Sequence, residues 1–128
     1  MLPEEVLKRH AGGFRWGTSD CVQFAADMVE YITGDRPSLP IYRSKSEADR
    51  FLADKTLEQA VTEEMGAPAP VIEAEYGDIV LTAFPDIGQV LGIADPPGFW
   101  IRSDRGIMPV ELNLGLKVFK CRKQQSRS

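Results

Sequence analysis

The residues best suited to chemistry lie together in the segment Ser19-Asp20-Cys21. A cysteine thiolate is a strong nucleophile, and a positioned cysteine can attack the acyl carbon of a peptide or amide. The only other cysteine is Cys121, so the pair offers neither metal-ligand spacing nor a disulfide framework. The alternative is that Cys21 is a small buried apolar residue, as free cysteines often are.

A cysteine nucleophile needs a base, and the sequence contains one histidine, His10. His10 closes a charged segment, 3–9, that has the features of a short helix, and two glycines follow it closely. The expected role is a cation at the carboxyl end of that helix, where the helix dipole favours positive charge. The alternative is that the glycine link lets His10 fold back toward Cys21 as its base.

Cys21 is expected in the first turn of a helix capped by Asp20 or Ser19. A short side-chain oxygen at this position accepts a bond from an orphan backbone N–H, and with Asp20 as cap Gln23 would complete a variant capping box. Gly34 is expected to end the helix. The apolar residues between fall on one stripe: Val22, Ala25, Ala26, Val29 and Ile32. The dipole favours an anion at the helix start, so the Cys21 thiolate should form more easily than in a free cysteine.

Three short motifs resemble the NlpC-type cell-wall peptidases. Phe14-x-Trp16-Gly17 followed by Asp20-Cys21 is similar to that family's opening motif, in which Asp-Cys begins the central helix of a papain-like core. Gly77-Asp78-Ile79-Val80 and Val90-Leu91-Gly92-Ile93 resemble its Gly-Asp-Leu-Val and His-Val-Gly-Ile strands. The similarity extends from about Phe14 to the C-terminal strand. It is closest to a small NlpC-like family encoded among the tail genes of phages and prophages.

The resemblance implies that Cys21 is the nucleophile, but it supplies no base. The family's catalytic histidine falls at Val90, or at Gln89 if the strand contains a one-residue bulge, and neither side chain is a base. Loss of a general base typically costs ~10²–10⁴-fold in rate. The resemblance also implies a cleft around Cys21, although its tryptophans could equally fill the core. The expected cleft residues are Trp16, Asp20, Gln89, Val90 and Trp100.

The remaining pattern predicts helices first and strands afterwards. Capping boxes at Ser44 and Thr56 begin two short helices, expected to form a helical hairpin. Tyr42 before them is expected on the surface, and the alternative is that it lines a cleft. Five β-like runs follow: 79–81, 89–94, 99–102, 107–108 and 116–121. The expected fold class is therefore α+β, with an antiparallel meander of about four to six strands. The resemblance implies that this α+β fold is a papain-like (NlpC-type) core.

Length and charge limit the possible classes of protein. With 128 residues, 1–121 are expected to form a single domain, and the basic tail 122–128 is expected to be disordered. A net charge of −4 argues against nucleic-acid binding as the main task. No apolar run is long enough to span a membrane, and the charged N-terminus does not resemble a signal peptide. Free cysteines suit a reducing compartment, so we expect a cytoplasmic protein, or a virion-associated one if it belongs to a phage.

Three functions are compatible with these observations. The favoured one is a structural or assembly component of a phage tail with a degenerate cysteine-hydrolase site, because the base is missing. The second is an active cysteine peptidase or amidase that cuts a peptidoglycan stem or another peptide, with an unusual base. The third is a non-catalytic peptide-binding module. The expected partners are phage tail proteins or a peptide or peptidoglycan ligand, and no cofactor or metal is expected.

Overall fold

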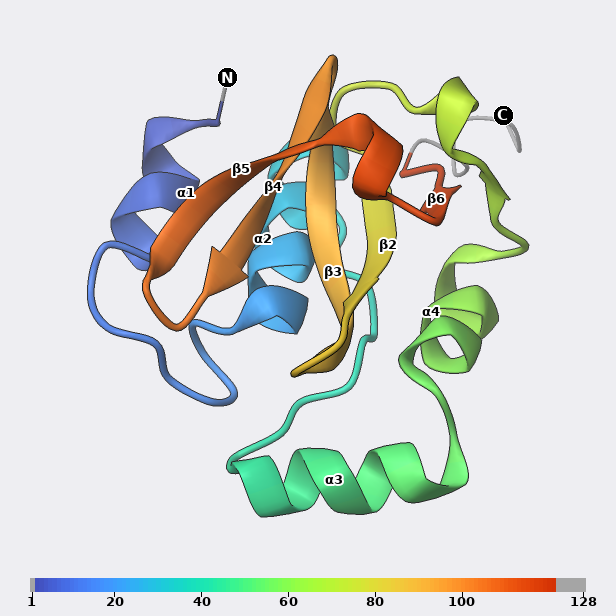
Figure 1. The fold of residues 1–128 in the computed structure, drawn as a ribbon. Helices are drawn as coiled ribbons and strands as arrows, with labels where there is room; N and C mark the ends of the chain where they lie inside the picture. The colour runs from blue at the N-terminus through green and yellow to red at the C-terminus, as the bar shows by residue number, and fades with distance from the viewer. Residues whose placement is uncertain (1, 122–128) are drawn as a thin grey trace.

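The structure, a computed structural model, describes residues 2–121 and has a six-stranded antiparallel sheet at its centre (Figure 1). The strands are β1 (Ala69–Pro70), β2 (Ile79–Phe84), β3 (Gly88–Asp95), β4 (Gly98–Ser103), β5 (Gly106–Glu111) and β6 (Lys117–Phe119). The longest helix, α2 (Cys21–Thr33), packs on β3 and β4. The predicted α+β class is confirmed, and the tail 122–128 lies outside the described residues.

The strand order is β1-β6-β2-β3-β4-β5. Strands β2 to β5 form the expected meander, but β6 lies between β1 and β2 and does not extend the far edge. The prediction of a simple meander is therefore wrong at its end. The reason is long-range pairing: Val118 is buried opposite Val80 on one side and pairs with Ala69 on the other. The short strand β1 was not predicted, because proline, here Pro70, is normally excluded from the interior of a β-sheet.

Three further α-helices surround the sheet: α1 (Glu4–Arg9), α3 (Lys45–Asp54) and α4 (Leu57–Met65). Helix α4 packs against β3 and β6, and its buried residues are Leu57, Ala60, Val61 and Met65. Helix α3 buries only Ala48 and stands apart at the lower edge of the molecule in Figure 1. The two helices are consecutive, as expected, but α4 uses its apolar side to cover the sheet. The expected helical hairpin is therefore not a compact packed unit.

The central strands are buried on both faces because their residues are apolar at successive positions. Toward α2, Leu81, Leu91 and Ile93 pack with Phe24 and Met28 in a first core cluster. The opposite face carries a second cluster: Val80, Val90, Ala94, Phe99, Ile101 and Val118. This second face is covered because β5 and the 3₁₀ helix η2 (Leu112–Leu114) pass in front of β2 and β3 (Figure 1). The start of α2 contacts both clusters through Cys21.

Candidate functional site

Cys21 occupies the first turn of α2, and Asp20 caps the helix as predicted. Asp20 Oδ1 accepts a hydrogen bond from the Gln23 N–H at 2.8 Å, and its Oδ2 accepts one from the Gly17 N–H at 2.8 Å. Gly17 has a φ of 84° and lies against the Tyr42 carbonyl, so its backbone needs both the freedom and the small size of glycine. The loop before Cys21 is thus held by the cap itself.

Gln23 does not complete the predicted capping box. Its Nε2 donates to the Pro40 carbonyl at 3.1 Å, and its Oε1 accepts from Arg36 Nη2 at 2.7 Å. A guanidinium is a stronger donor than a neutral backbone amide, and this competition explains the difference. The consequence is that residues 36–40 are tied to the first turns of α2.

The Cys21 thiol is less acidic than the sequence suggested. The pKa of Cys21 is raised to about 11, chiefly by burial; a hydrogen bond with the Leu91 backbone lowers it and the nearby Asp20 charge raises it, and both effects are included in that value. At neutral pH roughly one thiol in ten thousand is then ionised. The expectation of an easily formed thiolate is wrong because desolvation outweighs the helix dipole.

His10 follows α1 and is buried beneath it, with its side chain 0% exposed. Its Nδ1 lies 2.8 Å from Ser19 Oγ, and its Nε2 lies 2.7 Å from Asp27 Oδ2. His10 thus stands at the carboxyl end of α1, where it was expected, but its ring is buried and bonds to Ser19 and Asp27. Both ring nitrogens have partners other than Cys21, so the arrangement gives no support to His10 as the base for that thiol.

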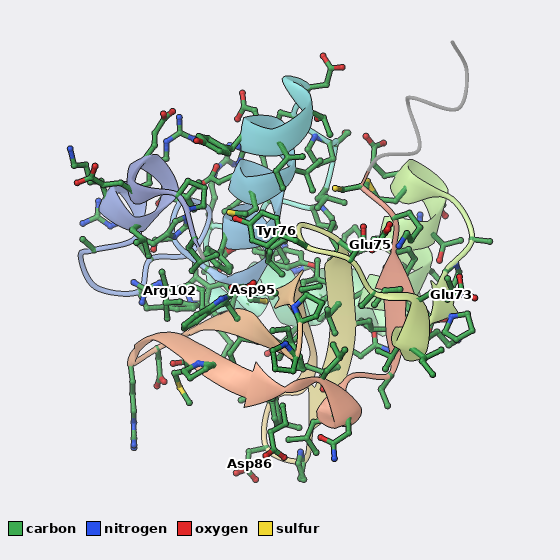
Figure 2. The ribbon with its side chains drawn as sticks, turned by 90° about the horizontal axis from the view of Figure 1, so that it is seen from above. Glu73, Glu75, Tyr76, Asp86, Asp95 and Arg102 are labelled. Carbon is green, nitrogen blue, oxygen red and sulfur yellow. The ribbon has the colours of Figure 1, made fainter. Side chains whose placement is uncertain are left out.

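His10 belongs to a longer chain of polar contacts, which we call the buried relay: Arg36, Asp27, His10, Ser19 and Arg102. Arg36 Nη1 donates to Asp27 Oδ1 at 2.5 Å, and Arg102 Nε donates to Ser19 Oγ at 3.0 Å. Arg102 also donates to the Gly12 carbonyl at 2.7 Å, and Figure 2 shows it beside the N-terminal loop. The relay therefore connects the N-terminal segment, α2 and β4.

The buried relay contains the residue types of a serine hydrolase triad. Ser19 lies within hydrogen-bond distance of His10, and His10 lies within hydrogen-bond distance of Asp27. Ser19 is only 6% exposed, however, and the Arg102 guanidinium occupies its oxygen. Burial opposes ionisation of Asp27, but hydrogen bonds from His10 and Arg36 prevail and hold its pKa below the usual value. These are the properties of a satisfied buried network that fastens α1, not of a nucleophile open to substrate.

The two expected replacements of the catalytic histidine have other contacts. Val90 is buried in the second core cluster, which Cys21 also touches. Gln89 Oε1 accepts a hydrogen bond from the Glu58 N–H at 3.1 Å, so this side chain helps to satisfy the start of α4. Neither supplies a proton acceptor to the thiol.

The two tryptophans lie on different parts of the first core cluster. Trp16 packs edge-on against Phe14 and Tyr42, with ring centroids 5.0 and 6.4 Å away. Trp100 donates through Nε1 to Asp95 Oδ2 at 2.9 Å, at the end of β3, and Asp95 is labelled in Figure 2. Trp16 thus lies in the segment that leads to Cys21, whereas Trp100 on β4 forms a hydrogen bond to Asp95 on the neighbouring strand β3.

Tyr42 is a further residue near Cys21, and the expected surface position for it is wrong. It is only 5% exposed, against the expectation of a surface position. The pKa of its hydroxyl is raised to about 12, chiefly by burial and to a smaller extent by the proximity of Cys21 and Asp20. Among residues 2–121, no hydrogen-bond partner reaches the Tyr42 hydroxyl. No sequence signal identifies this burial, because it depends on the Gln23–Pro40 contact.

Three residues of the buried relay, Asp27, Arg36 and Arg102, were not among the expected site residues, although Asp27 carried a signal. Asp27 is a charged residue inside the apolar run Ala25-Ala26-Asp27-Met28-Val29, and buried charges are rare unless they are paired. The pairing with His10 and Arg36 could have been sought on that basis. Across the described residues 2–121, no group of acidic, histidine and cysteine side chains could hold a metal ion.

The family described as "Domain of unknown function (DUF6950)" matches residues 2–121. The chain belongs to the DUF6950 family. The matched range includes Cys21, Tyr42 and the whole buried relay, so all of them belong to the DUF6950 domain. A search of curated proteins found no match. None of the helices within the described part of this DUF6950 chain is long and apolar enough to cross a membrane.

Proposed function

We propose that this DUF6950 chain is a non-catalytic protein of the papain-like, NlpC-type fold that serves as a structural or assembly component. The observation that carries the proposal is that the imidazole bonds to residues other than the thiol. Cys21 has a pKa of about 11, and both nitrogens of His10 are engaged by Ser19 and Asp27. A cysteine hydrolase needs a thiolate and a proton donor for the leaving group, and this arrangement favours neither.

The NlpC-type assignment has support from the position of three motifs. Cys21 begins a helix that packs on an antiparallel sheet, as the resemblance implies. The Gly77-Asp78 pair stands at the entrance of β2, and Val90 lies on the neighbouring strand β3. Asp78 ties this entrance together by accepting from the Glu75 N–H at 2.9 Å.

The biological setting follows from the same resemblance to phage and prophage tail-region proteins. The partners would be phage tail proteins, and the location would be cytoplasmic, or virion-associated after assembly. An active peptidase or amidase acting on a peptidoglycan stem is the competing proposal, and it would require Cys21 to ionise near neutral pH. A peptide-binding module is compatible with the non-catalytic proposal.

Alkylation by iodoacetamide tests the proposal, with each cysteine followed separately by mass spectrometry. Because only the thiolate reacts, labelling of Cys21 should be slow at pH 7 and should rise about tenfold per pH unit, without a plateau below pH 9. Cys121 is fully buried, so it reports any unfolding at high pH. A plateau for Cys21 below pH 7 in the folded protein would overturn the proposal. Loss of that plateau in His10→Ala would then identify His10 as the base.

A further inference from the structure

The two edge strands of the sheet are β1 and β5, and both contain proline. The strand order β1-β6-β2-β3-β4-β5 leaves one side of β1 and one side of β5 without a neighbouring strand. An edge strand normally offers unpaired N–H and C=O groups to which a strand of another molecule can bind. Whether these two edges can accept a strand therefore depends on which backbone groups face outward.

The backbone of Pro109 faces away from the sheet. Opposite residues of two antiparallel strands alternate between pairs that exchange two hydrogen bonds and pairs that exchange none. Pro109 lies opposite Trp100 and has no N–H, so this pair cannot be an exchanging one. The hydrogen bonds to β4 are therefore made by the neighbouring residues Met108 and Val110, and the Pro109 backbone points to the open side of β5.

The outward positions of β5 are Ile107, Pro109 and Glu111, with proline in the middle. The next residue, Leu112, agrees with this alternation, because its N–H points toward β4 and donates to the Pro97 carbonyl at 3.4 Å. Proline lacks the N–H, and its ring occupies the space into which the carbonyl of an added strand would project. A strand added to β5 would therefore find no donor at the centre of the edge.

The opposite edge of the sheet shows the same arrangement in β1. Pro70 lies opposite Lys117 of β6 and has no N–H to donate to it, so its backbone faces outward for the same reason. Pro68 comes two residues earlier and falls on the same side of the chain. The segment Pro68-Ala69-Pro70 thus lacks the N–H group at two successive outward positions of this edge.

We infer that both edges of the sheet are closed to strand addition, so that partner proteins, second copies of this chain included, bind through side-chain surfaces and do not extend the sheet. The reference to assembly partners rests on the proposed function, whereas the closed edges do not. An assembly component with an open sheet edge would be prone to uncontrolled stacking of its own copies. Proline at the outward positions prevents this stacking and leaves the two faces of the sheet unchanged.

Hydrogen exchange of the native protein tests the orientation of β5 without any substitution. The N–H groups of Met108 and Val110 bond to β4, so they should exchange at least roughly a hundredfold more slowly than those of Ile107 and Glu111. Slow exchange at Ile107 and Glu111 would overturn the inference, because the outward groups of β5 would then already have partners.

Pro109→Val restores the outward N–H and keeps an apolar side chain. We expect its apparent mass in sedimentation equilibrium to rise toward twice the native value as the concentration increases from micromolar to millimolar. Met108→Val is the matched control, because it places the same residue next to Pro109 at a position whose N–H faces β4. An unchanged mass of folded Pro109→Val, or an equal rise in Met108→Val, would overturn the inference. If Pro109→Val does not fold, the exchange rates of the native protein decide.

The β1 edge is tested by combining Pro68→Val with Pro70→Val, which restores both outward N–H groups. Its apparent mass should also rise with concentration, and an unchanged mass would overturn the inference for this edge. None of these measurements involves Cys21, so their outcome is separate from the alkylation test of the proposed function.

Discussion

The charge of Asp27 is expected to stabilise the fold through the buried relay, and Asp27→Asn tests this with little change in shape. The asparagine keeps one acceptor oxygen, so His10 Nε2 can still donate a hydrogen bond. It loses the negative charge that faces His10 and Arg36. The variant therefore separates the charge of residue 27 from its packing.

The expected loss of stability follows mainly from the hydrogen bonds of His10 and Arg36 to Asp27, because the third, from the half-exposed Arg9, is long at 3.4 Å. A hydrogen bond to a charged group contributes roughly 1 kcal/mol more than a neutral one, which gives about 1 kcal/mol for the buried His10 contact. The Arg36 side chain is 37% exposed, so solvent screening reduces its share to about 0.5 kcal/mol. We expect Asp27→Asn to lower the free energy of unfolding by about 1.5 kcal/mol at pH 7.

The stability difference between the native protein and Asp27→Asn should become smaller at acidic pH. The pKa of Asp27 is lowered in the folded protein, so its stabilising effect is present above the carboxyl pKa of the unfolded chain, about 3.9. It is lost as pH falls through the folded pKa, where the native carboxylate takes up a proton. Urea unfolding of both proteins at pH 7, 5, 4 and 3 should show a constant difference above pH 5 that shrinks below pH 4.

Asp49→Asn is the control, since Asp49 pairs with Lys45 in a fully solvated i,i+4 contact and should change stability by less than about 0.5 kcal/mol. Two results would refute the reasoning. One is an Asp27→Asn protein within about 0.5 kcal/mol of the native protein at pH 7. The other is a difference that persists unchanged at pH 3, because the loss would then come from packing.

Three further substitutions test other contacts. Gly77→Ala should cost about 1–3 kcal/mol in urea unfolding, because Gly77 has a φ of 92° and a Cβ would collide with Ile32; an unchanged midpoint would contradict this. Arg102→Met should speed hydrogen exchange in the segment around Gly12, whose carbonyl Arg102 holds, and leave α4 unaffected. Thr56→Ala should cost about 1 kcal/mol by removing the capping box of α4, and Thr56→Ser should restore most of it.

Local signals predicted the surroundings of Cys21 well. The Asp20 cap, the start of α2 at Cys21 and its end at Gly34, with a φ of 86°, depend on side chains within a few residues. The same is true of the capping box at Thr56. Such features follow from backbone hydrogen bonds that must be satisfied locally, so the sequence alone identifies them.

The chemistry of the site depended on distant residues and could not be predicted in this way. The pKa of Cys21 is set by burial against two core clusters, which no short motif encodes. His10 reaches Asp27, 17 residues away, and Arg102 reaches Ser19, 83 residues away. The position of β6 between β1 and β2 likewise depends on pairing across the whole chain.

The insertion of β6 between β1 and β2 has a consequence for how the chain folds during synthesis. Residues 69–70 and the outer edge of residues 79–81 both pair with residues 117–119, so these pairings cannot form until that late segment has left the ribosome. Until then, the nascent chain exposes an unpaired edge along β2, a strand rich in buried apolar residues. The meander β2 to β5 can form early because its pairings are local, but completion of the sheet must wait for β6. A ribosome stalled before residue 117 would therefore carry an aggregation-prone intermediate.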